Sequence, residues 1–539
     1  MVGYDVMVFV GMQRYLEHRQ REEIRAALLA EYGISLSCGE VSNLARLFLE
    51  YLLRLHTKRS GELSAALKAD GGWPLHVDAT GEDGRGTLFV AFSGWRRWVL
   101  GAWKLPTERA DAIEPCLRDV AARFGIPRAV VRDLGRAMTR AVDEWLAAEG
   151  IEIPVLGCHA HFLKDIGKDL LEPSHSALRA AFRNLKVRPR LRSLARDLGR
   201  KLGRTVDSTR QDVCAWLEKE VGYRDLPKGR AAGIGAVRAV AQWVLDYQSD
   251  SSGEDFPFDR PYLDLYNRCT LALRAVEGFL KAPPREKGVL KPLQRLQRIL
   301  APVGCELPLH PHVRSLIERA KLFDELRSAL RLVPPSAGKR ADNVRFLETA
   351  TSVGELRNIR KEVETLVWSL KVRREQCEAD SDTRKAINMI LKHIQDHGES
   401  LWGHEIQLPA EQGGGTRLVV RTNNDLEGFF RDLKHDERRR SGRKVLTQDF
   451  EHLPPEAALA RNLRHNDYVE IVCGSIDKLP NAFAQLDAED SRRRLAGEIA
   501  TPTELHRSPC IASASLPPAD RRLVRTDGMK NRLLAAAGD

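Results

Sequence analysis

Three strand-like runs in succession constrain the fold of this chain more than any other feature. Residues 75–80, 87–93 and 97–105 are rich in apolar, β-branched and aromatic side chains, and short turns join them. The first turn, 81–86, is rich in glycine. Such short connections predict an antiparallel meander of three strands. Asp78 lies inside the first strand, either as a catalytic carboxylate or as an ordinary polar strand residue.

After the meander the pattern alternates between helix and strand. Connection handedness makes the later strands parallel additions to the same sheet, so the predicted fold class is α/β with a mixed sheet. Side chains at the carboxyl ends of such strands commonly bind ligands. The predicted elements are a helix at 107–124, a buried strand at 128–133 that ends in Asp133, a helix at 137–149, and a strand at 153–157 that leads to Cys158 and His161.

The first 72 residues predict a helix-turn-helix. Apolar spacing indicates one helix over 12–31, and the capping-box pattern from Ser37 to Glu40 opens a second helix at about 39–55. The run 6–10 is apolar and strand-like. In a helix-turn-helix the exposed start of the second helix faces base edges. A plain helical hairpin is the alternative. The residues expected to contact DNA are Ser42, Asn43 and Arg46.

Between about 162 and 401 the pattern is almost entirely helical. Residues 183–204 hold nine Lys and Arg against one acid, Asp197. This basic run is expected either to follow a phosphate backbone or to form a solvated helix face. The members taken as DNA contacts are Arg188, Arg190 and Arg192.

A strand-like lead-in at 416–421 precedes a helix over about 425–440. Glu427 lies in its first turn, where it is either a catalytic acid or the capping-box partner of Asn424. Shorter helices and a proline-bearing tail follow. Leu426, Phe429, Phe430 and Leu433 form the apolar stripe of the helix, and Glu427, Arg431, Lys434 and Arg438 line its flank, with the three cations expected to hold phosphates.

The composition restricts the class of protein. No apolar run reaches the roughly 18 residues of a membrane span, so no membrane partner is expected. Nine scattered cysteines without CxxC pairs indicate reduced thiols in a cytoplasm, and a net charge of +11 suits a polyanionic partner.

Three acids in this order suggest phosphoryl-transfer chemistry. Two divalent cations about 4 Å apart can activate a water or a 3′-hydroxyl and neutralise the leaving oxygen. Carboxylates are the ligands that Mg²⁺ and Mn²⁺ prefer, and three crowded carboxylates would repel one another without a cation.

The chain resembles the DDE transposases with an RNase H-like core, in particular the Mutator-like branch. The resemblance covers residues 75–165 and 416–440, separated by the helical block. It rests on His76-Val77-Asp78-Ala79-Thr80, Val131-Arg132-Asp133, Cys158-x-x-His161 and Thr422-Asn423-Asn424-Asp425-Leu426-Glu427.

The resemblance implies a catalytic trio of Asp78, Asp133 and Glu427 that binds two Mg²⁺ or Mn²⁺ ions. It also implies that double-stranded DNA is the partner, that the protein acts as a homodimer or larger oligomer on DNA, and that it works at the bacterial nucleoid in the cytoplasm. The regions implied are a DNA-binding region at 1–72, an RNase H-like core at 73–165 and 411–445, an all-helical insertion at 166–410, and C-terminal helices at 446–539.

Some alternatives stay open. The residue after Asp133 is Leu134 rather than the small residue of many relatives, and Asp119 and Asp143 are poorer substitutes for the second acid. Asp425 competes with Glu427. Cys158 and His161 could be core residues or half of a zinc site. The rival functions are an inactive transposase-derived DNA-binding protein and a metal-dependent nuclease of the same superfamily.

Overall fold

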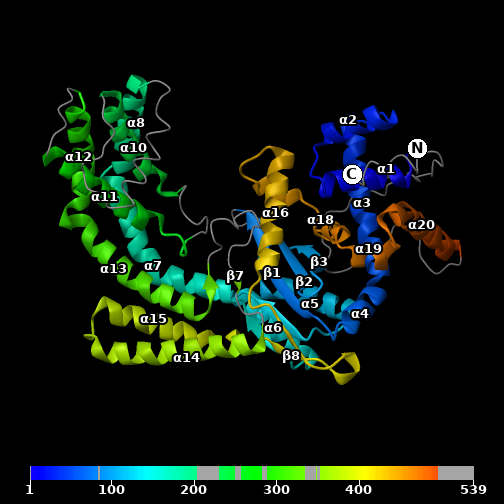
Figure 1. Cartoon of the computed structure of the whole chain (residues 1–539). Coiled ribbons are helices and arrows are strands. Elements are labelled where there is room, and N and C mark those ends of the chain that lie inside the picture. The colour runs from blue at the N-terminus through cyan, green and yellow to red at the C-terminus, as the bar shows by residue number, and fades with distance from the viewer. Residues whose placement is uncertain are drawn as a thin grey trace. The chain divides into compact units, whose positions relative to one another are not determined.

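The structure is a computed structural model that describes residues 2–82, 85–202, 230–248, 256–281, 288–333, 347–348 and 352–495. The chain forms two compact units. The first combines residues 1–161 with residues 399–539, and the second is the intervening segment, 162–398 (Figure 1). The regions expected at 1–72, 411–445 and 446–539 therefore share one unit with residues 73–161 of the expected core.

A five-stranded mixed sheet is the centre of the first unit, as the α/β prediction requires. Its order is β3-β2-β1-β4-β5; β1 pairs with β2 and β2 with β3 in antiparallel fashion, whereas β4 and β5 add in parallel beyond β1. The strands are β1 (Pro74–Glu82), β2 (Arg85–Ser93), β3 (Trp98–Lys104), β4 (Ala129–Arg132) and β5 (Val155–Gly157).

Helices from both ends of the chain pack around this sheet. α16 and α17 contact β1, α17 also contacts β2, and α5 contacts β2 and β3. A separate pair of short strands, β8 (Glu405–Gln407) and β9 (Thr416–Leu418), precedes α16. The helices are α1 (Tyr4–Tyr15), α2 (Arg21–Tyr32), α3 (Cys38–Lys58), α4 (Ser60–Ala69), α5 (Ala110–Phe124), α6 (Arg136–Glu149), α16 (Asn424–Ser441), α17 (Thr447–His452), α18 (Ala457–Ala460), α19 (Asn466–Cys473) and α20 (Leu479–Leu495).

The N-terminal prediction was partly wrong. The run 6–10 lies inside helix α1, and every one of its residues is buried, so periodicity alone could not distinguish a buried helix from a strand. The single helix expected over 12–31 is the end of α1 and the separate helix α2. The capping box of Ser37 and Glu40 is confirmed at the start of α3.

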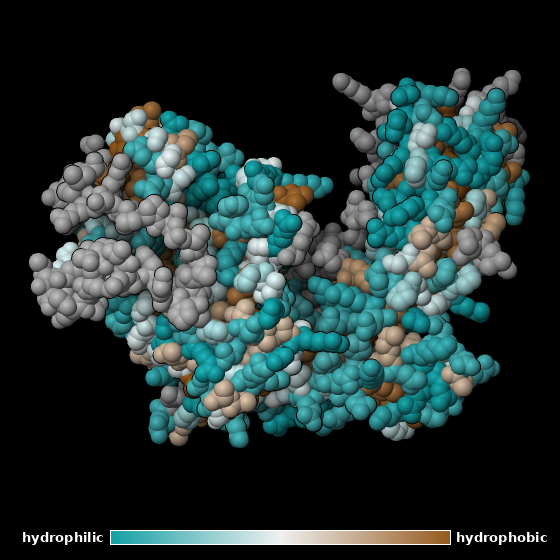
Figure 2. Space-filling model, turned by 180° about the vertical axis from the view of Figure 1, so that it is seen from behind, coloured by the Kyte–Doolittle hydropathy of each residue, from teal (hydrophilic) through white to brown (hydrophobic). Residues whose placement is uncertain are grey.

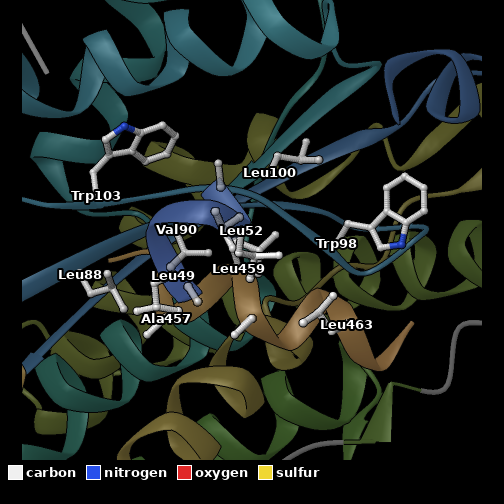
Figure 3. Packing of buried hydrophobic residues seen from close by; sticks show 14 of the residues in the cluster. Leu49, Leu52, Leu88, Val90, Trp98, Leu100, Trp103, Ala457, Leu459 and Leu463 are labelled. Atoms are coloured by element: carbon white, nitrogen blue, oxygen red, sulfur yellow. The ribbon is translucent and has the colours of Figure 1, made fainter. Parts of the chain in front are cut away.

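One hydrophobic core joins the sheet to helices that are distant in the sequence. α18 packs against both β3 and α3, and α20 packs against α1 and α3. Figure 3 shows side chains of this core: Leu49 and Leu52 from α3, Leu88 and Val90 from β2, and Ala457 and Leu459 from α18. The C-terminal helices therefore complete the core of the first unit.

Where the structure describes it, the second unit is helical except for one short strand pair, β6 (Leu332–Val333) with β7 (Leu347–Glu348), so the prediction of an all-helical insertion needs this correction. α8 packs against α10 and α12, and α13, α14 and α15 pack against one another. The helices are α7 (His159–Asn184, which begins in the first unit), α8 (Val187–Leu202), α10 (Arg230–Leu245), α11 (Pro261–Lys281), α12 (Leu290–Gly304), α13 (Glu306–Ala329), α14 (Val353–Gln376) and α15 (Asp382–His397).

The visible surface of the molecule is mostly hydrophilic, with scattered apolar residues (Figure 2). Among the described residues, no helix combines the length and the apolar character needed to cross a bilayer.

Candidate active site at the carboxyl edge of the sheet

Strand register brings Asp78 and Asp133 together. β4 lies beside β1 with Leu75 opposite Val130 and His76 opposite Val131. If this register is continued for two more residues along both strands, Asp78 comes opposite Asp133, the first residue after β4. Neighbouring strands lie about 4.8 Å apart, and residues opposite one another share a face of the sheet. The two carboxylates therefore belong to one row across the sheet.

Cys158 extends this row by one strand. β5 pairs with β4 so that Gly157 lies opposite Arg132, and the next residue, Cys158, comes opposite Asp133. The ladder continues at this point, because the amide of Cys158 donates to the carbonyl oxygen of Arg132 at 2.8 Å. The Cys158 side chain is fully buried.

The Asp78 carboxyl group has an unusual environment. The side chain is only 7% exposed, and Oδ1 accepts a hydrogen bond from the Ala79 amide at 2.8 Å. Burial raises the pKa of Asp78 to about 7; the charge of His161 lowers it, whereas those of Asp133 and Glu427 raise it further. These couplings show that the four ionisable groups, drawn from positions 78 to 427, share one electrostatic environment.

Asn423 places the start of α16 against the sheet. This residue is fully buried, and its side chain accepts a hydrogen bond from His76 Nδ1 at 2.9 Å and donates one to the Val77 carbonyl oxygen at 3.1 Å. Its amide donates to Cys158 Sγ at 3.3 Å, and its carbonyl accepts from the Glu427 amide at 2.7 Å. One residue thus links β1, the end of β5 and the first turn that carries Glu427.

The capping-box alternative for Glu427 was wrong. The N-cap of α16 is Asn423, its side chain makes no capping hydrogen bond, and Glu427 is the fourth residue of the helix. A capping-box glutamate is the third residue and reaches back to the N-cap amide. The Asn423 amide donates to a thiol instead, so helix capping does not account for the acid at position 427.

His161 is paired with Glu427. Its Nε2 is 3.6 Å from Glu427 Oε1, and both side chains are 19% exposed. Burial lowers the pKa of His161, but interactions with Cys158, Asp78 and Glu427 outweigh it, so the pKa stands well above its usual value. A protonated His161 is a cation that partly balances the acids around it.

Sequence reasoning missed two contributors to this site. Asn423 was read only as part of a motif, although its buried hydrogen bonds set the position of α16. Glu108, in the loop between β3 and α5, lies near Asp133; burial and then the charge of Asp133 raise the pKa of Glu108. Nothing in the local sequence around Glu108 indicates that this loop residue lies near Asp133.

The donor set fits a hard divalent cation by chemistry, because Asp78, Asp133 and Glu427 offer carboxylate oxygens. Among the described residues, no three His, Cys, Asp or Glu side chains already stand close enough to enclose an ion. Glu427 is instead paired with His161. Burial, and after it the charges of Asp133 and Glu427, raise the pKa of Asp78, and a bound cation would favour its charged form.

The cations expected on α16 are partly engaged inside the protein. Lys434 donates to the Gly81 carbonyl oxygen at 2.7 Å and lies 3.6 Å from Glu82, and Arg438 lies 3.6 Å from the same carboxylate. Arg431 lies half-buried one turn beyond Glu427. These contacts tie the flank of α16 to the end of β1.

The other expected DNA contacts lie on separate helices. On α3, Asn43 is exposed, Ser42 accepts a hydrogen bond from Arg21, and Arg46 bonds Asn43 and Glu50. In the second unit, the half-buried guanidinium of Arg188 lies 5.6 Å from the centre of the Tyr247 ring, whereas both other members, Arg190 and Arg192, are exposed.

Comparison with known proteins adds no assignment. No family model, no curated protein and no solved structure matches the chain.

Proposed function

We propose that this protein is a DNA transposase whose catalytic core is an RNase H-like sheet. The observation that carries the proposal is the electrostatic coupling of Asp78 to Asp133 and Glu427, acids up to 349 positions apart in the sequence. A buried acid with a raised pKa beside other acids is a common mark of catalytic sites, and Asp78 is such an acid. The order of the sheet, with three antiparallel strands followed by two parallel ones, also supports the proposal.

In the proposed reaction, water cuts a phosphodiester at the end of a mobile element, and the released 3′-hydroxyl then attacks target DNA in line. Asp78, Asp133 and Glu427 would hold one or two Mg²⁺ or Mn²⁺ ions. A bound cation would activate the attacking oxygen and stabilise the leaving oxygen. Homodimers or larger oligomers on double-stranded DNA belong to the same proposal.

The residues of the chain have distinct roles in this scheme. Asp78 ligates only as a carboxylate, so its raised pKa makes proton loss part of cation binding. His161 holds Glu427 while no cation is present. Asn423 positions the first turn of α16 against β1 and therefore sets how far Glu427 lies from Asp78.

Cleavage and joining of DNA in the presence of Mg²⁺ or Mn²⁺ would test the proposal. The substrates are duplexes taken from the DNA on either side of the coding sequence, with a supercoiled plasmid as target. Loss of activity in Asp78→Asn, Asp133→Asn and Glu427→Gln should exceed the roughly 10–100-fold typical of residues that only support a metal ligand. Asp143→Asn, an exposed acid on α6, is the matched control and also tests the alternative second acid.

Each outcome separates the candidate functions. Cleavage that survives Asp78→Asn would refute the assigned active site. Cutting without joining would identify a nuclease. Binding of the same duplexes with no cleavage in either cation would identify a DNA-binding protein that lacks activity.

A further inference from the structure

Helix α8 in the second unit presents two opposite faces. Its apolar residues are buried, and α10 and α12 pack against the helix. Arg192, Arg196 and Arg200 are exposed and recur every four residues. At 100° per residue they lie within about 80° of one another and opposite the buried face, along roughly 12 Å of helix. The buried residues are Val187, Leu191, Leu194, Ala195 and Leu198.

The charge of this arginine ridge, Arg192, Arg196 and Arg200, is only partly balanced, by the electrostatic interaction of Asp197 with Arg200 and Arg196. Asp197 is the sole acid of α8, and it accepts a hydrogen bond from Arg295 of α12 at 2.7 Å. Among the described residues, no carboxylate forms an ion pair with the ridge. Like charges four residues apart destabilise a helix, so the sequence retains an unfavourable arrangement here.

On two other helices, the residue four positions after an arginine is an acid that pairs with it. Arg140 pairs with Glu144 on α6, and Arg360 pairs with Glu364 on α14, each four residues away. Among the described residues, the ridge arginines therefore lack the intrahelical ion pair that Arg140 and Arg360 have. A multivalent anion would relieve the repulsion.

Two other arginines lie near the ridge, and they differ in their surroundings. Arg188 lies against Tyr247 and belongs to the packed side of α8. Arg238 of α10 approaches Gly199 so closely that an added Cβ there would lie 3.1 Å from the guanidinium Nε. The absence of a side chain at position 199 lets this cation lie beside the ridge.

The form of the surface favours nucleic acid over a membrane. A helix that lies on a membrane inserts an apolar face, whereas the apolar face of α8 is buried in the helix bundle. None of the exposed large apolar side chains of the described residues lies on α8. A row of guanidinium groups without apolar neighbours suits the evenly spaced charges of a phosphate backbone.

We propose that Arg192, Arg196 and Arg200 form a binding ridge for the backbone of duplex DNA, used without regard to base sequence. The ridge lies on a different unit of the chain from the candidate active site. The inference rests on the proposed action on DNA and assigns part of the affinity to this surface.

The test measures duplex binding without catalysis. Fluorescence anisotropy of a labelled random-sequence duplex, in EDTA and over a series of NaCl concentrations, gives the slope of log K against log salt. Arg192→Gln/Arg196→Gln/Arg200→Gln should make this slope less negative by about 2.7, because each phosphate contact contributes about 0.9. The matched control removes three exposed cations from three other helices: Arg314→Gln/Lys371→Gln/Lys392→Gln.

The control should change the slope much less than the ridge variant does. Equal changes in the two triple variants would show a general effect of net charge and overturn the proposal, as would a wild-type protein that does not bind the duplex. Binding to phosphatidylserine vesicles that the ridge variant loses, with an unchanged DNA slope, would assign the surface to membranes instead. Circular dichroism confirms that both variants are folded.

This test and the cleavage test fail independently. A protein that binds duplex through the ridge but does not cut it refutes the proposed chemistry alone. A protein that cuts DNA normally, with an unchanged salt slope in the ridge variant, refutes the ridge alone.

Discussion

At the scale of single residues, Asp78 lies in an environment that differs sharply from solution. It is buried in a strand that is covered on both faces, and two acids and one histidine surround it. Burial raises the pKa of Asp78 to about 7, so the folded protein holds a proton that the unfolded chain releases near pH 4. Stability from this residue therefore falls as pH rises from about 4 to about 7.

Asp78→Asn should remove this pH dependence. In EDTA, we expect the variant to melt at a higher temperature than wild type at pH 8 and at a similar temperature at pH 4. The difference between this pKa of about 7 and the ordinary value of 3.8 sets an upper limit of about 4 kcal/mol on the stability difference. Thermal unfolding at several pH values measures it, with Asp143→Asn as the control. A difference that is the same at pH 4 and pH 8 would contradict the raised pKa.

Asn423 is the second residue with a defined consequence, because it links three elements around the site. Truncation of its side chain breaks the hydrogen bonds to His76 Nδ1 and to the Val77 carbonyl oxygen, at a cost of about 1–3 kcal/mol for each buried group left unsatisfied. It should also loosen the position of Glu427 relative to Asp78. A residue that only supports the fold would change stability alone, whereas a positioning residue also changes where Glu427 lies.

Asn423→Ala should raise the Mn²⁺ concentration needed for half-maximal cleavage by about 10–100-fold, the range for residues that orient metal ligands. Asn462→Ala is the matched control, because Asn462 is also buried and bonds both the amide and the carbonyl of Val99 at 2.8 Å, on β3. Both variants should be destabilised. An equal rise in the Mn²⁺ requirement for both would show that only stability is involved.

At the scale of elements, close helix packing explains how the N-terminal segment joins the core. α1 crosses α3 at Gly11, where an added Cβ would lie 2.0 Å from Cγ of the Phe48 ring. Phe48 also stacks with Tyr15, at 6.3 Å between ring centres. A glycine at this point of α1 lets the two helices approach.

Gly11→Ala should therefore destabilise the protein by about 1–3 kcal/mol, the usual cost of overpacking a core. Gly61→Ala on α4 provides the contrast, since nothing lies within 4 Å of an added Cβ there and its backbone needs no left-handed conformation. That substitution should stabilise by up to about 1 kcal/mol through helix propensity. Chemical denaturation measures both changes. A neutral Gly11→Ala would show that the contact is looser than the structure indicates.

At the scale of the whole molecule, the two compact units do not follow one another along the chain. The second unit is one continuous segment, whereas the first is assembled from two segments separated by that insertion. The C-terminal segment supplies α16 to α20, whose buried side chains belong to the same core as the sheet. The sheet therefore depends on residues that follow it by some 300 positions.

Residues 162–398 produced alone should fold, because this segment makes its own compact set of contacts. We expect strong helical circular dichroism and a cooperative thermal transition. Residues 1–161 alone should lack such a transition, because Leu426, Phe430 and Leu433 would no longer cover their part of the core. A cooperative transition in 1–161 would show that the sheet does not need the C-terminal helices.

The elements of the sheet and of α16 could be predicted from the sequence, because strand alternation and helix periodicity are local properties. The meander, the two later strands and the helix at 424–441 lie close to their expected positions. Local pattern failed at 6–10, where a run buried on all sides has no period that separates helix from strand.

Which polar residues meet depends on the tertiary structure. The register of β1 with β4 aligns Asp78 with Asp133, and buried hydrogen bonds of Asn423 set the start of α16. The pairing of His161 with Glu427 joins residues 266 positions apart. No local period encodes such contacts, because they depend on the packing of whole elements and on the desolvation that packing imposes.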